Sequence, residues 1–530
     1  MKKSIQLFFA FLLIGFSAKS DIPADVENAM LRATKFMVEK VSTNGGYLWQ
    51  YLPDFSRRWG EMEAYETMIW VQHPGTVSMG HSFLDAYKVT GNEYYYQAAE
   101  KAASALIWGQ NDCGGWNYII DFAGDRSLKN WYNTIGKNGW RLEEFQHYYG
   151  NATFDDDVSS DAARFLLRLY LVKMDMRYKP ALDKAINFII ESQYPLGGWP
   201  QRYPLKYDFV KKGLPDYSSF YTFNDDVIWE NVNLLIQCYI TLGEERFLDP
   251  IRRGMNFYLI TQQGNPHGGW GQQYNMELEP TGARTYEPPA LLPGTTFNNA
   301  MLLLKFYEYT GDRRFLTRIP DAIQWLESVR LPENMTDGGK YTHPTFVEIR
   351  SNKPVFVHRK GSNIAHGYYY YDYNDGMLLS HYGGKGNVDI EALKKEYRRV
   401  SLLPPEMVTK NSPLKVEKFE SIDTPQSYYN LSRYSLSEIP DEAKVREIIN
   451  SLDDQGRWLA GNKNTSNPYI GDGQNRELTE KYASTDAGDE TDTSPFIDRS
   501  DQKYISTAEY IRKMNLLINY LGQIKDSRAK

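Results

Sequence analysis

The sequence predicts an all-α protein, an α/α toroid that forms an incomplete α/α barrel of helical hairpins, with a short β-hairpin and an irregular C-terminal segment. Two repeats predict this fold. A Gly-Gly turn recurs five times from Gly45 onward, at intervals of 69, 83, 71 and 70 residues. A Thr-Phe motif followed by Asp or Asn recurs three times, each time beside an apolar helical pattern. Periods of this length with helices on both sides are typical of stacked or circularised hairpins.

The individual helices follow from apolar residues at helical spacing. A Thr-Gly-Asn or Thr-Gly-Asp link joins two of the predicted pairs, and its glycine is the usual C-terminal cap of a tight helical turn. We expect helices at 79–89, 94–108, 181–193, 251–263, 300–309 and 315–329, and two more that begin just after 157 and 226.

The periodicity lapses from about residue 340. Residues 346–349 and 354–357 are expected to form a short hairpin around Ser351-Asn352-Lys353. The proline-containing stretch 402–440 is expected to wrap around the domain. Residues 461–500 are rich in Asn, Asp, Thr and Ser, which is typical of a loop. Helices at 443–452 and 508–521 would complete the ring.

Length and composition indicate an exported protein. Residues 1–20 have the pattern of a secretory signal, because Lys2 and Lys3 precede a short apolar run and two small residues. That run is too short to span a membrane, so we expect a periplasmic or secreted monomer without a membrane span. We assign residues 21–400 to the toroid domain and 401–530 to the wrapping segment and ring-completing helices.

Charge and cysteine content narrow the possible partners. The net charge of −7 argues against nucleic acid and membrane surfaces. An anionic ligand would need a local basic cleft or a bridging cation. Cys113 and Cys238 could pair in an oxidising compartment, but Cys238 lies in an apolar helical pattern, where a buried free thiol is expected.

Two acidic helix entrances stand out. Residues 153–158 read Thr-Phe-Asp-Asp-Asp-Val, and residues 222–227 read Thr-Phe-Asn-Asp-Asp-Val. One Asp at a helix start is an ordinary cap, whereas adjacent carboxylates repel unless a cation or protons relieve them. We therefore expect a cation or sugar site at these two entrances. For the third copy, at 296–300, we expect only a capped helix entrance.

Further motifs carry aromatic and cationic side chains. The turn 197–204 presents Trp199 and Arg202, and the loop 283–289 holds Arg284 between prolines. Trp199 suits either core packing or sugar stacking, and Arg284 suits either chemistry or a salt bridge to Glu287. The sequence contains no phosphate-binding loop, zinc-binding His-Glu-x-x-His or Gly-x-Ser-x-Gly elbow.

Together these motifs resemble the pectate lyases of polysaccharide lyase family ten, the pectic acid lyase family, whose fold is an α/α toroid. The resemblance covers roughly residues 40–385, and four motifs carry it in one order. They are 152–157, 197–201, 222–226, and 272–273 followed by 283–287.

The resemblance implies calcium-assisted β-elimination of α-1,4-linked galacturonan, with Arg284 as the base. The acidic entrances would bind Ca²⁺ and substrate, and basic side chains would contact substrate carboxylates. The resemblance matches Asp155 and Asp225 or Asp226 to the residues that bind calcium and substrate, and Arg359 to a residue that contacts a substrate carboxylate. From the residues and the resemblance together, we expect Asp155, Asp225 and Asp226 as metal ligands and Asp155, Asp156, Trp199, Arg202, Asn224 and Arg359 as substrate-binding residues. The implied partner is an acidic polysaccharide, polygalacturonate.

The residue chemistry supports this division of roles. Removing the proton beside a uronate carboxylate builds negative charge, which a divalent cation and arginines stabilise. Arginine normally keeps its proton, so Arg284 as a base requires other cations nearby.

Alternatives remain open. One is a lyase that acts on another uronate glycan, and a second is a glycoside hydrolase with two carboxylates. A third is a non-catalytic pectin-binding relative, which Thr345 and the stretch around Gly294 favour because both depart from the family pattern.

Overall fold

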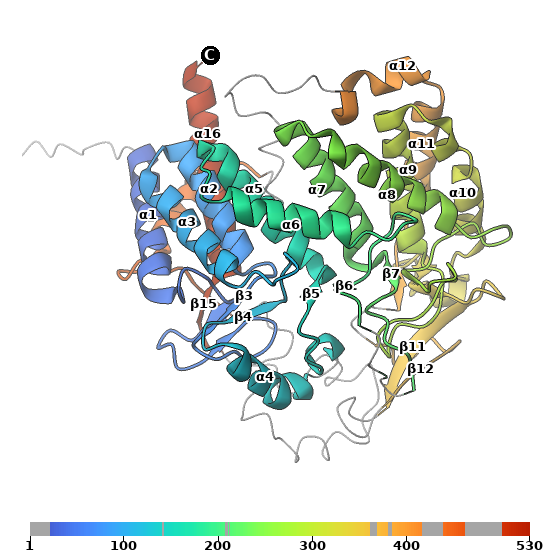
Figure 1. The fold of residues 1–530 in the computed structure, drawn as a ribbon, viewed down its shortest axis with the longest axis horizontal. Helices are drawn as coiled ribbons and strands as arrows, with labels where there is room; N and C mark the ends of the chain where they lie inside the picture. The colour runs from blue at the N-terminus through green and yellow to red at the C-terminus, as the bar shows by residue number, and fades with distance from the viewer. Residues whose placement is uncertain are drawn as a thin grey trace, which may run out of the picture.

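The computed structural model describes residues 22–139, 142–206, 210, 213–360, 368–379, 384–415, 438–461 and 501–529. Paired helices form an arc in two rows (Figure 1). The inner row contains α16 (Thr507–Ala529), α2 (Thr76–Thr90), α5 (Val158–Lys173), α7 (Val227–Leu242) and α9 (Pro293–Thr310). The outer row contains α1 (Ile22–Phe36), α3 (Glu93–Trp108), α6 (Lys179–Glu191), α8 (Leu248–Thr261) and α10 (Ile319–Ser328). This arrangement confirms the predicted incomplete α/α barrel.

Helix α5, in the middle of the inner row, is buried on almost every side because helices of both rows pack against it. In α5, even the polar side chains between Val158 and Tyr170 are buried. Two buried arginines of α5 pair with acids on the neighbouring inner helices. Arg164 lies 2.8 Å from Glu230 of α7, and Arg168 forms an ion pair with Asp85 of α2. Such pairs are costly to break, so they hold α2, α5 and α7 side by side.

The Gly-Gly repeat marks the places where a turn touches the backbone of the next outer helix. Gly114 has φ +103°, and a Cβ there would lie 2.3 Å from the carbonyl oxygen of Lys184 in α6. Gly197 has φ +110°, and a Cβ there would lie 2.0 Å from the carbonyl oxygen of Arg253 in α8. Only glycine fits both the left-handed backbone and the close approach.

The tryptophan after each of three Gly-Gly turns is a core residue. Trp116, Trp199 and Trp270 are fully buried. Each indole Nε1 donates a hydrogen bond to a carbonyl of the preceding outer helix, namely to Leu106, Ile189 and Tyr258. A buried indole N–H requires such an acceptor. The tryptophans therefore anchor the turns to the helices.

Short antiparallel ladders, which the sequence did not reveal, connect each entrance to a later turn. Strand β5 (Ala152–Thr153) pairs with β6 (Arg202–Tyr203), and β7 (Tyr221–Thr222) pairs with β8 (Gln273–Tyr274). In the first ladder Thr153 lies opposite Arg202. The same pattern occurs earlier between β3 (Met68–Trp70) and β4 (Ile119–Asp121). Two-residue strands show no alternation that a sequence pattern could reveal.

The hairpin predicted after residue 340 is present and has an additional strand. Strand β10 (Phe346–Val347) pairs with β11 (Pro354–Lys360), and β11 pairs with β12 (Tyr368–Asp372). A four-stranded sheet near the N-terminal helices has the order β14-β15-β1-β2. Its strands are Leu459–Ala460, Tyr504–Ser506, Gln50–Tyr51 and Arg58–Trp59. The remaining elements include α4 (Asp125–Thr134), α11 (Ile390–Ser401), α12 (Pro405–Val408), α14 (Glu442–Asn450), β9 (His343–Pro344) and β13 (Lys385–Gly386).

The third Thr-Phe motif is not a helix entrance, which corrects the prediction. Helix α9 begins at Pro293, so Thr296 and Phe297 lie inside it. Proline is favoured in the first helical turn, where its missing N–H costs nothing, and it starts this helix earlier than the Thr-Phe pattern indicates. Thr296 instead accepts a hydrogen bond from the backbone N–H of Trp270.

The predicted C-terminal helices are present, and α16 packs against α1 and α2 while α14 packs against α1 and α16.

Cys113 and Cys238 are both free thiols, and Cys238 is buried as expected. In the described part of the chain, no helix is both long and apolar enough to cross a membrane. The signal at 1–20 and most of the predicted loop at 461–500 lie outside the described residues.

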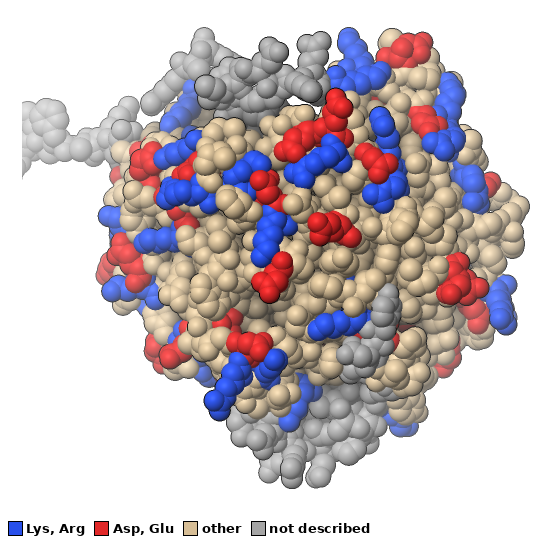
Figure 2. Space-filling model, viewed as in Figure 1, with Lys and Arg blue, Asp and Glu red and all other residues tan. Residues whose placement is uncertain are grey.

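Charge is mixed over the face that Figure 2 shows, where acidic and basic side chains alternate. The negative net charge is therefore not gathered into one patch on this face. A charged ligand would have to be recognised by a local group of side chains.

Candidate active site

The two acidic entrances have the same unusual backbone. Asp156 and Asp157 have φ of 47° and 60°, and Asp225 and Asp226 have φ of 51° and 55°. Positive φ is disfavoured for residues with a Cβ, and such strain gathers at functional sites. The short turns η4 (Asp155–Asp157) and η5 (Asn224–Asp226) contact each other. Ladders β5–β6 and β7–β8 precede them, so the fold brings both acidic turns to one place.

Asp155 lies at the buried end of this site, with 1% of its surface exposed. One carboxylate oxygen accepts hydrogen bonds from the Tyr118 hydroxyl and from Arg284 Nη2, which is 2.7 Å away. The other oxygen accepts from Gln201 Nε2 at 2.5 Å. Burial opposes ionisation, but Arg284 and the hydrogen bonds outweigh it and hold the pKa of Asp155 well below its ordinary value. Asp155 is therefore a carboxylate.

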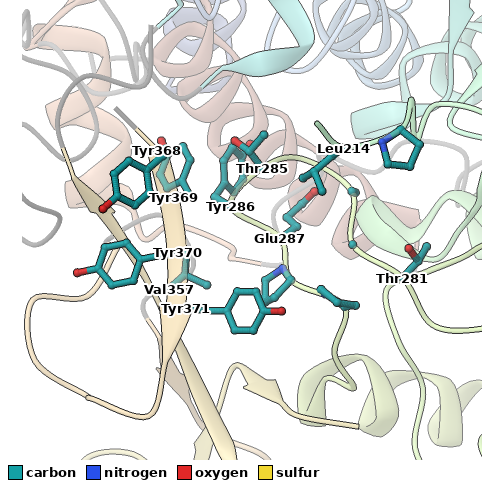
Figure 3. Close-up of a pocket in the computed structure, with 15 residues that line it drawn as sticks. Leu214, Thr281, Thr285, Tyr286, Glu287, Val357, Tyr368, Tyr369, Tyr370 and Tyr371 are labelled. Atoms are coloured by element: carbon teal, nitrogen blue, oxygen red, sulfur yellow. The ribbon is translucent and has the colours of Figure 1, made fainter. Parts of the chain in front are cut away.

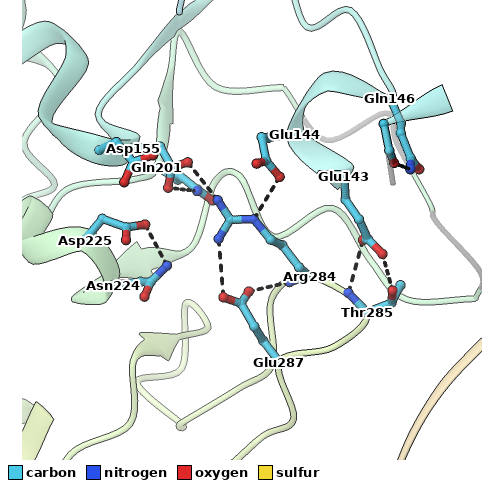
Figure 4. A network of polar contacts seen from close by, with 12 residues as sticks. Glu143, Glu144, Gln146, Asp155, Gln201, Asn224, Asp225, Arg284, Thr285 and Glu287 are labelled. Carbon is cyan, nitrogen blue, oxygen red and sulfur yellow. Dashed lines mark hydrogen bonds and ion pairs between the residues drawn. The ribbon is translucent and has the colours of Figure 1, made fainter. Parts of the chain in front are cut away.

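Arg284 is surrounded by three acids (Figure 4). In addition to the contact with Asp155, Arg284 Nε lies 3.2 Å from Glu144, and Arg284 Nη1 lies 3.3 Å from Glu287. The backbone N–H of Arg284 also donates to Glu287 at 2.8 Å, which fixes the loop. Burial alone would lower the pKa of Arg284, but the nearby acids raise it well above its ordinary value. The guanidinium is therefore held in its charged form.

Asp156 and Asp225 form the more open half of the site. Gln72 Nε2 donates to Asp156 at 2.5 Å, and Asn224 donates to Asp225 at 2.7 Å. The surrounding protein and the charge of Asp155 raise the pKa of Asp156 to about 7. Burial and the charges of Asp155 and Asp156 raise the pKa of Asp225 well above its ordinary value. Asp156 and Asp225, beside the ionised Asp155, thus retain protons that a cation would displace.

Arg202 lies beside this group, in a cage of aromatic rings. Its guanidinium is 4.6 Å from the ring centroid of Tyr149 and 5.3 Å from that of Tyr118. Only long hydrogen bonds of 3.4 Å join it to Asn117 and Asn151. Its buried Nη2 has no acceptor within the described part of the chain. An unpaired buried donor is costly, so this arrangement suits an anionic ligand.

The structure brings Asp155, Asp156, Asn224, Asp225 and Arg284 together, as the sequence predicted. Another prediction is wrong. Trp199 has no exposed surface for stacking on a sugar, because it fills the core beneath its turn. Arg359 is also buried, on β11, and its contact with a substrate carboxylate stays a prediction. Asp226 is exposed, and its charge acts on Tyr258 of α8.

Glu143, Glu144, Tyr118 and Gln72 complete the site, and the sequence analysis missed them. Glu143 accepts hydrogen bonds from the backbone N–H and the hydroxyl of Thr285, which holds the loop beside Arg284. The available signal was a pair of acids between apolar residues at 142 and 145. The salt bridge between Arg284 and Glu287, weighed as an alternative role, is present.

The described residues contain no group of three or more His, Cys, Asp or Glu side chains whose arrangement would already hold a metal ion. This result fits the contacts of Asp155, whose oxygens already accept hydrogen bonds from Tyr118, Arg284 and Gln201. A cation would therefore bind at the open half, near Asp225 and Asp156, and would need further oxygens from its ligand.

The sequence profile of the pectic acid lyase family matches residues 122–401, just over half of the chain. The comparison with curated proteins found no match. The chain is similar in structure to a family 10 polysaccharide lyase from Cellvibrio cellulosa, with 17% identity, 61% of this chain and 98% of that chain covered, and a TM-score of 0.41. A mutant of the Cellvibrio lyase in complex with trigalaturonic acid has 18% identity, the same coverage and the same TM-score. A cellobiose 2-epimerase from Bacillus thermoamylovorans has 10% identity, coverage of 94% and 99%, and a TM-score of 0.42.

Proposed function

Because the chain belongs to the pectic acid lyase family, we propose that it cleaves α-1,4-linked galacturonan by calcium-assisted β-elimination, with Arg284 as the base. The observation that carries this proposal is the position of Arg284, which lies 2.7 Å from Asp155 and beside both acidic turns. The partner would be polygalacturonate, and the predicted export signal places the enzyme in the periplasm or outside the cell.

The reaction requires two changes in the substrate. A base takes the proton from C5, beside the uronate carboxylate, and the C4–O glycosidic bond then breaks as a C4–C5 double bond forms. The departing oxygen takes up a proton and becomes the hydroxyl of the released sugar. The carboxylate becomes more negative on the way, so positive groups near it lower the barrier. Arg202, with its unsatisfied buried Nη2, would bind a substrate carboxylate. Asp156 and Asn224, in the open half, would position the sugar.

Asp225 and Asp156 would hold Ca²⁺ with substrate oxygens as further ligands. Asp226 would lie beside them, and Asp155 would contribute its charge while its oxygens keep their hydrogen bonds. The clustered carboxylates and their raised pKa values fit a hard cation that prefers oxygen ligands. When bound, the cation supplies a positive charge that neutralises the carboxylates of enzyme and substrate.

As the proposed base, Arg284 would have to lose the proton that its acidic neighbours help it to keep. Three acids hold the guanidinium charged in the absence of ligands. Asp155 must be neutralised from its other side before Arg284 can release a proton more readily. Calcium is therefore proposed to act on catalysis itself as well as on substrate binding.

The test is incubation of the purified protein with polygalacturonate, with calcium and with a chelator. We expect an unsaturated product, detected by its ultraviolet absorbance, only when calcium is present. Reducing sugar without ultraviolet absorbance would indicate a hydrolase instead. Calcium-dependent binding without any product would indicate a binding protein.

A further inference from the structure

A second pocket lies behind the loop that carries Arg284. Its volume is about 570 Å³, within the range of about 300–1,000 Å³ that is usual for ligand sites. Ala283, Thr285, Tyr286 and Glu287 line one wall, on either side of Arg284 in the chain. Strand β12 lines the opposite wall (Figure 3). One loop thus separates this pocket from the acidic site.

Strand β12 supplies the pocket with aromatic rings. Its sequence from 368 to 371 is Tyr-Tyr-Tyr-Tyr, and alternate side chains of a strand point to opposite faces. On one face, Tyr369 packs edge-on against Tyr286, with ring centroids 5.3 Å apart. Tyr371 follows on the same face, with 49% of its surface exposed. On the other face, Tyr370 stacks on His358 at 5.1 Å.

On the face that it shares with Tyr369, Tyr371 is the more exposed ring, and Figure 3 shows it reaching toward the loop below Glu287. Tyr368, Tyr370 and Tyr371 are all exposed and line the pocket, and a contiguous exposed aromatic patch of this kind marks a ligand-binding groove. Tyrosine combines a flat apolar face with a polar hydroxyl. This combination suits a sugar ring, which has C–H groups on its face and hydroxyls at its edge.

The charge of the pocket restricts which sugar it takes. Among the described residues that line it, Glu287 alone bears a formal charge, and its fully buried carboxylate faces Arg284. No lysine, arginine or histidine belongs to this described lining. A uronate carboxylate placed here would lose water without gaining a cationic partner, which is costly. An uncharged sugar avoids this cost.

We propose that this pocket is a subsite for an uncharged sugar unit of the polysaccharide, adjacent to the unit held at Arg284. The unit would be a methyl-esterified galacturonate or a neutral side-chain sugar, since both lack the carboxylate charge. The inference rests on the proposed function, because it takes the ligand to be the same polysaccharide. Under this proposal the enzyme accepts a polysaccharide in which some sugar units carry no charge, and it binds one such unit in this pocket.

The experiment measures binding and cleavage separately. Three oligogalacturonides of equal length are compared: fully de-esterified, partly methyl-esterified, and de-esterified with a neutral side-chain sugar. The proteins are the wild type, Tyr371→Ala, Tyr371→Phe and Tyr371→Lys. Tyr373→Ala is the matched control, because Tyr373 is also 49% exposed but does not line the pocket.

We expect Tyr371→Ala to weaken binding of an uncharged-unit ligand by roughly three- to tenfold, with little change for the de-esterified one. Tyr371→Phe should retain the preference, and Tyr371→Lys should reverse it toward the charged ligand. If Tyr371→Ala weakens binding of the methyl-esterified ligand, the uncharged unit is a methyl-esterified galacturonate. If it weakens binding of the ligand with a side chain, the unit is a neutral side-chain sugar. Equal effects on all three ligands, or the same selective loss in Tyr373→Ala, would overturn the proposal.

Failure of this inference is distinguishable from failure of the proposed function. If the protein makes unsaturated product but Tyr371 does not affect selectivity, only the subsite proposal is wrong. If it makes no such product yet binding depends selectively on Tyr371, the lyase activity is wrong and the subsite stands.

Discussion

Arg284 Nη2 lies 2.7 Å from an oxygen of Asp155, although 129 residues separate the two in the chain. Both side chains are almost fully buried, and Glu144 and Glu287 also contact the guanidinium. This pair connects the acidic helix entrances to the loop that carries the proposed base.

Substitution of Arg284 by lysine should lower kcat by about 10²–10⁴-fold, the usual contribution of a general base. Lysine keeps the positive charge but cannot reach three acids with a planar fork. Unsaturated-product formation under saturating substrate measures the effect. Because lysine can itself act as a base, Arg284→Gln is the deciding variant. Activity of Arg284→Gln within a few-fold of the wild type would show that Arg284 is not the base.

The stability of Arg284→Ala provides a companion measurement. Its removal leaves Asp155, Glu144 and Glu287 without their shared cation, and such losses cost about 3–5 kcal/mol in the free energy of unfolding. Urea unfolding measures this cost. Arg314→Ala is the control, because Arg314 pairs with Asp312 on the exposed surface, and it should have little effect.

Asp225→Asn should weaken calcium binding by at least about tenfold, because affinity for hard cations depends on the number of charged oxygen ligands. Calcium should raise the melting temperature of the wild type by mass action. The variant should require correspondingly more calcium for the same rise. Asp249→Asn, at a carboxylate that is 78% exposed beside Arg253, serves as the control. Identical calcium titrations for Asp225→Asn and wild type would exclude Asp225 as a ligand.

Without calcium, the stability of the protein should fall as the pH rises from about 4 through about 7. The pKa of Asp156 is raised to about 7 in the folded protein, so the folded state binds this proton more tightly than the unfolded state. Its contribution is fully present below the ordinary pKa and is lost as Asp156 ionises. Asp225, whose pKa is also raised, contributes with the same sign.

Thermal unfolding in chelator at about pH 5 and about pH 8 measures this loss. Asp156→Asn should reduce the difference in melting temperature between the two pH values. Calcium should reduce the same difference in the wild type. If Asp156→Asn leaves the pH dependence of thermal stability unchanged, other titrating groups cause that dependence.

Trp199→Ala should destabilise the fold by about 3–5 kcal/mol, as expected for a large buried aromatic residue. The Michaelis constant for polygalacturonate should not change where the variant is folded, because Trp199 has no exposed surface. Trp108→Ala, at a position that is 56% exposed, should cost much less. A raised Michaelis constant with unchanged stability would return Trp199 to a sugar-binding role.

The sequence by itself determined the features that depend on local chemistry. Helical periodicity, the glycines of the hairpin turns and the two acidic entrances were all readable, because each acts within a few residues of the chain. The order of four motifs also identified Arg284 and the acids around Asp155 as one candidate site. The repeat also predicted that the two acidic helix entrances lie side by side in the folded chain.

Only the tertiary structure decided which side chains meet across the repeats. Glu144 lies 140 residues from Arg284 in the chain yet contacts it, and nothing local marks that pairing. The structure also assigned Trp199 and Arg359 to the interior, since a side chain is buried by its neighbours in space. The pKa values of Asp156 and Asp225 depend in the same way on charges that folding brings near them.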